Sequence, residues 1–198
     1  MSDVDLISAI QHDFQRNWQL NDEGHREPHF NDVYKTGLTI VERVGEQASI
    51  SWRDILMVAY FHDLFAWSRN NHHLMSKAWI LTTTHPIVET LYPDAVSRNR
   101  IANACGEHRA SYSGEFSTLL SEVMSSADRG IPGQLDKSIE RSIAYNLHHG
   151  VPQKNVEAVA ISHIKERYGR TGYARYPVLY KNVFAVELEQ FWNDIDQL

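Results

Sequence analysis

The sequence predicts an all-α fold, a bundle of helices that continues into a helical C-terminal extension. Apolar residues recur at intervals of three and four along most of the chain, which is the spacing of one buried helix face. Capping residues precede several of these apolar runs. No run alternates between apolar and polar residues as a half-buried strand would. These observations favour helices throughout and argue against a sheet.

The first three helices are predicted from apolar periodicity and capping patterns. Residues 2–18 form the first, with Ser2 as its N-cap and an acidic residue three positions later. A polar loop follows, and the second helix is expected over about 30–46. The third begins at Ser51 with a similar capping pattern and runs through apolar residues as far as the pair 62–63.

The later helices follow the same periodicity and are separated by loops, several of them rich in glycine or proline. They are predicted over about 72–83, from Pro86, from Ser97 to His108, and over about 115–128, 135–147, 156–164 and 183–195.

We expect a single domain over 1–198, with a core of about 25–130 that contains the candidate site and C-terminal helices over 131–198. The segment 130–134, GIPGQ, is the best candidate for a joint between two parts. We interpret it as a loop inside one domain.

Charge and cysteine content narrow the function classes. The net charge is −6, so binding to nucleic acid polymers or to an anionic membrane surface is not expected. A small anionic substrate remains open, because a metal ion or a local basic pocket can override the global sign. Cys105 is the only cysteine, which excludes a thiolate zinc site within one chain. With no signal-peptide pattern and no apolar run that could span a membrane, we expect a cytoplasmic protein.

Three apolar helices carry imidazole or carboxylate groups at one of their ends. His62 and Asp63 end the third helix, His29 begins the second, and Asp128 ends a later one. The pair 62–63 taken alone favours a capping aspartate beside a surface histidine. If the three ends converge, however, two imidazoles and two carboxylates meet. That mixture suits a divalent ion such as Mn, Fe, Co, Ni or Zn, with Mg as a further candidate.

The order of these residues resembles the H…HD…D signature of the HD superfamily of metal-dependent phosphohydrolases. The chain is similar, over about 25–130, to a bacterial subgroup of small HD hydrolases that are predicted to act on nucleotides. The segments that carry the resemblance are His29-x-x-x-Val33, His62-Asp63, His72-His73-x-x-Ser76-x-Ala78, His108 and Ala127-Asp128-Arg129.

The resemblance implies an HD-type helical bundle that hydrolyses a phosphate ester or anhydride of a nucleotide with a water that the metal activates. The metal ligands that it implies are His29, His62, Asp63 and Asp128. Asp63 would also hydrogen-bond the attacking water. His73 or His108 would stabilise the developing charge or protonate the leaving oxygen.

Two departures from the superfamily limit the substrate. Residues 64–67 contain no acidic side chain, whereas hydrolases of alarmone nucleotides and some nucleotidases carry one shortly after the HD pair. The pair Gly172-Tyr173 lacks the proline that completes the Gly-Tyr-Pro signature of c-di-GMP phosphodiesterases. Neither identity is carried over to this chain.

Basic and imidazole side chains outside the signature are candidates for substrate binding. They are His72, Lys77, Arg129, Arg170 and Arg175. One of His72 and His73 could instead bind a second metal ion, and so could His108. Arg170 and Arg175 lie in 165–181, where basic residues alternate with tyrosines that could hold phosphate and stack on a base. The alternative for this segment is packing between helices or at a subunit interface. For Arg129 the alternatives are anchoring of Asp128 or a surface ion pair. The remaining histidines, including His25, are interpreted as structural or solvated.

Other functions remain open from the sequence. A degenerate HD domain could bind a nucleotide as a sensor without turnover. A helical interaction module would use its histidines structurally. A di-iron HD oxygenase would need further ligands such as His73 and His108. A homo-oligomer is also compatible with the sequence.

Overall fold

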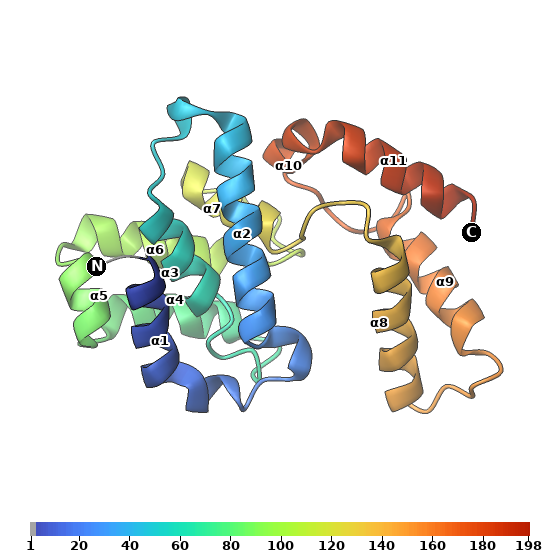
Figure 1. Ribbon diagram of the computed structural model, residues 1–198, viewed down its shortest axis with the longest axis horizontal. Coiled ribbons are helices and arrows are strands. Elements are labelled where there is room, and N and C mark those ends of the chain that lie inside the picture. Colours follow the sequence, from blue (N-terminus) through green and yellow to red (C-terminus); the bar gives the residue numbers. More distant parts are fainter. Residues whose placement is uncertain (1–2) are drawn as a thin grey trace. The chain divides into compact units, whose positions relative to one another are not determined.

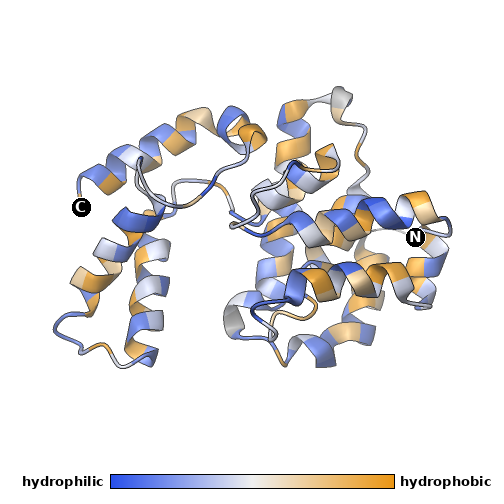
Figure 2. Ribbon diagram, turned by 180° about the vertical axis from the view of Figure 1, so that it is seen from behind, coloured by the Kyte–Doolittle hydropathy of each residue, from blue (hydrophilic) through white to orange (hydrophobic). Residues whose placement is uncertain are grey.

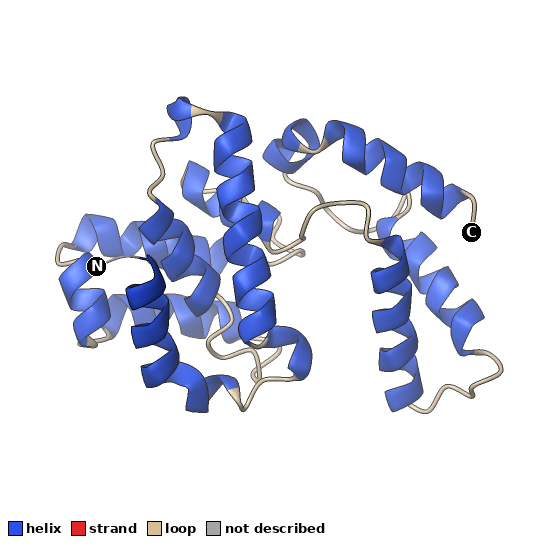
Figure 3. Ribbon diagram, viewed as in Figure 1, coloured by secondary structure: helices blue, strands red, loops and turns tan. Residues whose placement is uncertain are grey.

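The computed structural model describes residues 3–198, and every regular element in that range is a helix (Figure 3). Helices account for 68% of the chain, so the all-α prediction is confirmed. The expected N-cap Ser2 lies outside the described residues. The chain divides into two compact units, residues 1–130 (unit 1) and 131–198 (unit 2). The division falls at the segment 130–134, and the folding of both units as one domain stays a prediction.

The helices of unit 1 follow one another through loops (Figure 1). They are α1 (Asp3–Trp18), the 3-10 helix η1 (Glu23–His25), α2 (Glu27–Val44), the 3-10 helix η2 (Glu46–Ala48), α3 (Trp52–Phe61), α4 (His72–Thr82), α5 (Pro86–Leu91), α6 (Ala95–Glu107) and α7 (Leu119–Ala127).

Three of these helices begin elsewhere than the periodicity predicts. Helix α2 starts earlier, at Glu27, because Pro28 suits a first helical turn, where its missing N–H leaves no bond unmade. Helix α6 starts at Ala95 and not after Ser97, because the Asp94 side chain accepts from the Ser97 N–H at 2.8 Å and caps the helix. Helix α7 starts later, at Leu119, because the Thr118 side chain accepts a hydrogen bond from the Ser121 N–H and caps the helix there.

Helix α3 lies inside unit 1 and sets the position of the site. Every residue from Ile55 to Phe61 is fully buried, because α3 packs against α1, α2, α6 and α7. Gly37 permits the close approach of α2, since a Cβ atom there would lie 2.6 Å from Ile55 Cγ2. A side chain that leaves the C-terminal end of α3 therefore enters the interior of the unit.

Aromatic side chains fix α1 beside α2 and α3. Phe14 lies edge-on to Phe61 with 4.9 Å between ring centroids, and Trp18 lies 5.2 Å from Phe30. On another side of the core, α4 packs along α6, and α6 packs along α7. These contacts bring the ends of α3, α6 and α7 and the starts of α2 and α4 within reach of one another.

Unit 2 consists of α8 (Leu135–His148), α9 (Val156–Tyr168), α10 (Val178–Val183) and α11 (Ala185–Asp196). Helix α8 packs against α9, and α11 packs against all three of the others. The buried side chains of this unit are mostly apolar and include Val156, Ala160, Ile164, Tyr180, Phe184, Leu188, Phe191 and Ile195. Figure 2 shows hydrophobic and hydrophilic bands alternating along these helices, as in amphipathic helices.

Among the helices of residues 3–198, none is both long enough and apolar enough to cross a lipid bilayer.

Candidate metal centre

The HD pair follows directly on the buried helix α3. His62 is the C-cap residue and keeps helical φ and ψ angles of −57° and −38°. The His62 residue is 1% exposed and Asp63 is 3% exposed. Both side chains therefore lie inside unit 1, and the alternative of a surface histidine beside a capping aspartate is wrong.

One oxygen of the Asp63 carboxylate faces two imidazoles. Asp63 Oδ2 lies 3.3 Å from His62 Nε2 and 3.6 Å from His29 Nε2. Asp128 Oδ1 lies 3.2 Å from His29 Nε2 and 3.5 Å from His62 Nε2. The candidate ligand atoms of these four residues lie within 4.8 Å of one another. The structure thus brings together the four metal ligands expected from the sequence, which we name the first cluster.

The other oxygen of the same carboxylate faces two further imidazoles. Asp63 Oδ1 lies 3.4 Å from His72 Nε2 and 3.4 Å from His108 Nε2. The two Nε2 atoms are 3.3 Å apart. Asp63, His72 and His108 form the second cluster, whose three members are all buried. Asp63 therefore belongs to both clusters, with one oxygen directed to each.

Three of the imidazoles are oriented by the carbonyl oxygen three residues earlier. The Nδ1 atoms of His62, His72 and His108 lie 2.9, 3.0 and 2.6 Å from the carbonyl oxygens of residues 59, 69 and 105. A carbonyl oxygen only accepts, so each Nδ1 carries the proton and donates it. In the neutral ring the Nε2 lone pair is then directed into the cluster, as in metal-binding histidines.

The second cluster fits a cation. With Nδ1 as the protonated nitrogen of each ring, neutral forms of His72 and His108 would present their Nε2 lone pairs to each other and to Asp63 Oδ1, so that three acceptors would face one another. Within the described part of the chain, Asp63 Oδ1 is buried and has no hydrogen-bond partner, an arrangement that is costly unless a positive charge compensates it. Imidazole and carboxylate ligands of this kind could hold a divalent metal ion.

The electrostatics of the metal-free first cluster are those of an ion-pair network. Burial lowers the pKa of His62, but Asp63 and Asp128 outweigh it and hold that pKa well above 6.5. The pKa of His29 is raised for the same reason. Burial raises the pKa of both carboxyl groups, yet the imidazoles bring the pKa of Asp63 and of Asp128 well below 3.8. Without a metal ion, protonated imidazoles would therefore compensate the two carboxylates of this cluster.

His72 differs from the first-cluster histidines. Burial lowers its pKa to about 4 in spite of the nearby Asp63 charge, and His108 adds to the lowering. His72 is therefore neutral at physiological pH and offers a lone pair without losing a proton. The sequence placed His72 among the substrate-binding candidates, whereas the structure places it with candidate metal ligands.

The other expected site residues of unit 1 surround the clusters. His73 follows His72 on α4, and its Nδ1 atom is buried without a hydrogen-bond partner among residues 3–198. The aliphatic stem of Lys77 packs on α6, where a Cβ at Gly106 would meet Lys77 Cδ at 2.8 Å. The Arg129 guanidinium donates to the Ser125 backbone oxygen and, at 2.9 Å, to the Ser125 hydroxyl. It thus ties the segment after Asp128 back to α7.

The two arginines expected to bind substrate in unit 2 are exposed. Arg170 donates to Glu189 at 2.6 and 2.9 Å and to Asp196 at 3.1 Å, so its fork is occupied by carboxylates. Arg175 lies in the loop between α9 and α10. The contacts of Arg170 favour the packing interpretation of segment 165–181, and its role in substrate binding stays a prediction.

Two residues that the sequence left out of the site lie against it. Asn21 is 1% exposed, and its amide nitrogen donates to the backbone oxygens of Asp63 at 2.9 Å and His25 at 3.0 Å. Its amide oxygen accepts from the Trp67 N–H at 3.0 Å. His25 Nε2 lies 3.9 Å from Asp63 Oδ2. The spacing of four between His25 and His29 was the only sequence signal for either residue.

No protein-family model matches the chain, and no curated protein sequence or solved structure matches it.

We expect the stability of the metal-free chain to fall as pH rises above 6.5. The raised pKa values of His29 and His62 mean that their protonated forms stabilise the fold, a contribution that is complete below the unfolded value of 6.5 and lost as pH passes the folded values. Metal binding competes with these protons, so metal affinity should rise over the same range. Melting temperatures measured across this pH range, once with chelator and once with saturating metal, test both expectations. Two melting-temperature profiles that run parallel with pH would contradict them.

Asn21→Ala is expected to weaken metal binding by about tenfold or more, because the backbone around Asp63 loses its anchor. It removes the acceptor of the Trp67 N–H and one of two partners of the Asp63 carbonyl, which still accepts from the Ala66 N–H at 3.1 Å. We expect this loss to cost about 1–3 kcal/mol of folding stability. The matched control is Asn17→Ala, because Asn17 is an exposed residue of α1. Calorimetric metal titration of both folded variants separates positioning from stability. Wild-type affinity in Asn21→Ala would show that Asn21 has no positioning role.

Proposed function

We propose that this chain is an HD-type metal-dependent phosphohydrolase that acts on a small anionic substrate. The observation that carries the proposal is the convergence of His29, His62, Asp63 and Asp128. These residues come from helix ends far apart in the sequence, with positions 29 and 62 separated by 33 positions. Their order is that of the superfamily signature, and their geometry provides a mixed imidazole and carboxylate ligand set.

Each residue of the site has a role that follows from its position. His29, His62 and Asp128 would hold the ion, and Asp63 would hold it while accepting a hydrogen bond from the attacking water. A divalent ion bound there would lower the pKa of a coordinated water and polarise a phosphoryl oxygen. His73, at the edge of the clusters, would donate to a substrate oxygen from its ring. The buried end of α3 keeps bulk water from the far side of the clusters.

A nucleotide is the proposed substrate, by analogy with the subgroup that the sequence resembles. The net charge of −6 disfavours a nucleic acid polymer. A positively charged centre inside unit 1 would nevertheless attract a small phosphate compound, because local charge dominates at contact distance.

A second candidate function follows from the position of Asp63 between the clusters. A carboxylate with one oxygen towards each cluster could bridge two metal ions, which the di-iron oxygenase alternative requires. Its additional ligands would be His72 and His108, in place of the His73 and His108 that the sequence suggested. Metal-dependent oxygen consumption without phosphate release would favour this candidate over a phosphohydrolase.

The proposal predicts metal-dependent turnover in a hydrolysis screen over nucleotides, with products identified by mass. Asp128→Ala should lower turnover by about 100-fold or more, because it removes a ligand of the catalytic ion. Asp32→Ala is the matched control, since Asp32 is an exposed acidic residue of α2. It should keep the wild-type rate.

The alternatives give different results in the same screen. A nucleotide sensor would bind one of the compounds without turnover. An interaction module would bind neither metal nor nucleotide. If the wild-type chain hydrolyses a nucleotide and Asp128→Ala does so at the same rate, the proposed site is contradicted although the activity is present.

A further inference from the structure

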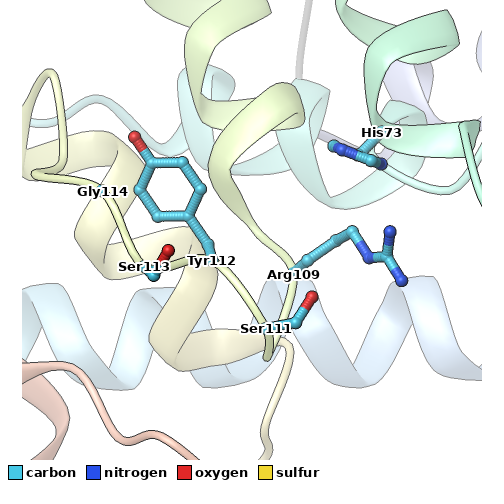
Figure 4. A pocket seen from close by; sticks show the side chains of 6 residues that line it. All are labelled: His73, Arg109, Ser111, Tyr112, Ser113 and Gly114. Atoms are coloured by element: carbon cyan, nitrogen blue, oxygen red, sulfur yellow. The ribbon is translucent and has the colours of Figure 1, made fainter.

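A surface pocket lies beside the second cluster and is built mainly from donors. It has a volume of about 210 Å³ and is lined by His73, Arg109, Ser111, Tyr112, Ser113 and Gly114. Figure 4 shows His73 and the Arg109 guanidinium on one side and Tyr112 and Ser113 on the other. The loop that follows α6 supplies all the lining residues except His73.

The charge of this pocket is positive. Arg109 contributes a permanent cation, and no carboxylate is found among the described residues that line the pocket. The nearest acidic residues in the chain, Glu107 and Glu115, are not among the lining residues. The Glu107 carboxylate accepts from the N–H and hydroxyl of Ser117 at 2.9 and 3.1 Å, and its charge also acts on Tyr112. The Arg109 side chain makes one hydrogen bond, from Nη1 to the Asn70 backbone oxygen at 3.2 Å. The rest of its planar fork is available to a ligand.

The remaining polar groups also suit an oxyanion. Ser111 and Ser113 bring two exposed hydroxyls, and His73 brings a buried ring nitrogen without a partner in the described chain. The Tyr112 hydroxyl donates to the Glu115 backbone oxygen at 2.9 Å, and this bond fixes the ring at the side of the pocket. An arginine fork with several hydroxyl donors matches a phosphoryl group, whose three oxygens accept from different directions.

The pocket is connected to the second cluster through the chain itself. His73 follows His72, and Arg109 follows His108, so two pocket residues are direct neighbours of two cluster members. Consecutive Cα atoms are about 3.8 Å apart. The His72 and His73 rings lie 5.5 Å apart between their centroids, so a ligand held by His73 would lie next to the second cluster.

The geometry points to this pocket as a binding site for a second phosphoryl group of the substrate, held by Arg109 and His73 while another phosphoryl group is at the metal centre. This inference rests on the proposed function. It narrows the substrate to compounds with at least two phosphoryl groups close together, such as a nucleoside diphosphate or triphosphate, and disfavours simple monophosphates. Arg109 then determines specificity without holding the metal.

A pair of non-hydrolysable probes tests the inference without turnover. Methylenediphosphonate carries two phosphoryl-like groups, and methylphosphonate carries one. The metal-loaded full chain is titrated with each by calorimetry, and the metal content is measured before and after. We expect the diphosphonate to bind more tightly than methylphosphonate. Arg109→Gln should weaken diphosphonate binding about tenfold and leave methylphosphonate binding unchanged. The exposed Arg16→Gln on α1 is the control for loss of charge alone.

A second variant tests the pocket independently, in case Arg109→Gln does not fold. Ser113→Asp places a negative charge at an exposed position of the pocket and should weaken diphosphonate binding in the same way. Unchanged diphosphonate affinity in both variants would overturn the inference, as would an equal loss in Arg16→Gln. An equal loss for both probes would indicate an independent phosphate site and would overturn the assignment to the substrate.

The outcome is separable from that of the proposed function. Arg109-dependent diphosphonate binding without nucleotide hydrolysis would support the pocket and reject the hydrolase. Hydrolysis with Arg109-independent binding would keep the hydrolase and reject the pocket.

Discussion

The buried carboxylate of Asp63 is the constraint on which the rest of the site depends. A carboxylate that is 3% exposed at the end of an apolar helix must be compensated by positive charge. Four imidazoles lie within 3.6 Å of its two oxygens, and they come from α2, α4 and the residues that follow α3 and α6. The helices of unit 1 are thus arranged so that their ends meet at one charged group.

The surrounding structure keeps that group and its partners in place. Helix α3 is fully buried from Ile55 to Phe61, which prevents the HD pair from turning to solvent. Backbone carbonyls orient His62, His72 and His108 through Nδ1, and Asn21 ties the Asp63 backbone to the loop before α2. Contacts with the backbone therefore fix the orientation of these candidate ligands.

Sequence periodicity was sufficient to predict the helices, because apolar faces are local signals. The first cluster was expected only from the order of its four residues, which resembles the HD signature. Periodicity was insufficient where contacts link distant segments. Nothing in the sequence joins His72 to His108, which are 36 residues apart, so His72 was assigned to substrate. Arg170 was a candidate for phosphate binding from the sequence, but in the structure it forms ion pairs with Glu189 and Asp196. Arg109 belongs to none of the sequence motifs, and its candidate role in binding follows only from its position in the pocket.

We propose that the clusters around Asp63 hold metal. The most direct test is a crystal structure of the metal-loaded protein with anomalous data collected at the absorption edge of the bound metal. The account predicts an anomalous peak among His29, His62, Asp63 and Asp128 at about 2.0–2.2 Å from their ligand atoms. A second peak at Asp63, His72 and His108 would add a bridged ion. Full metal occupancy elsewhere in the chain, with no peak at either cluster, would contradict the account.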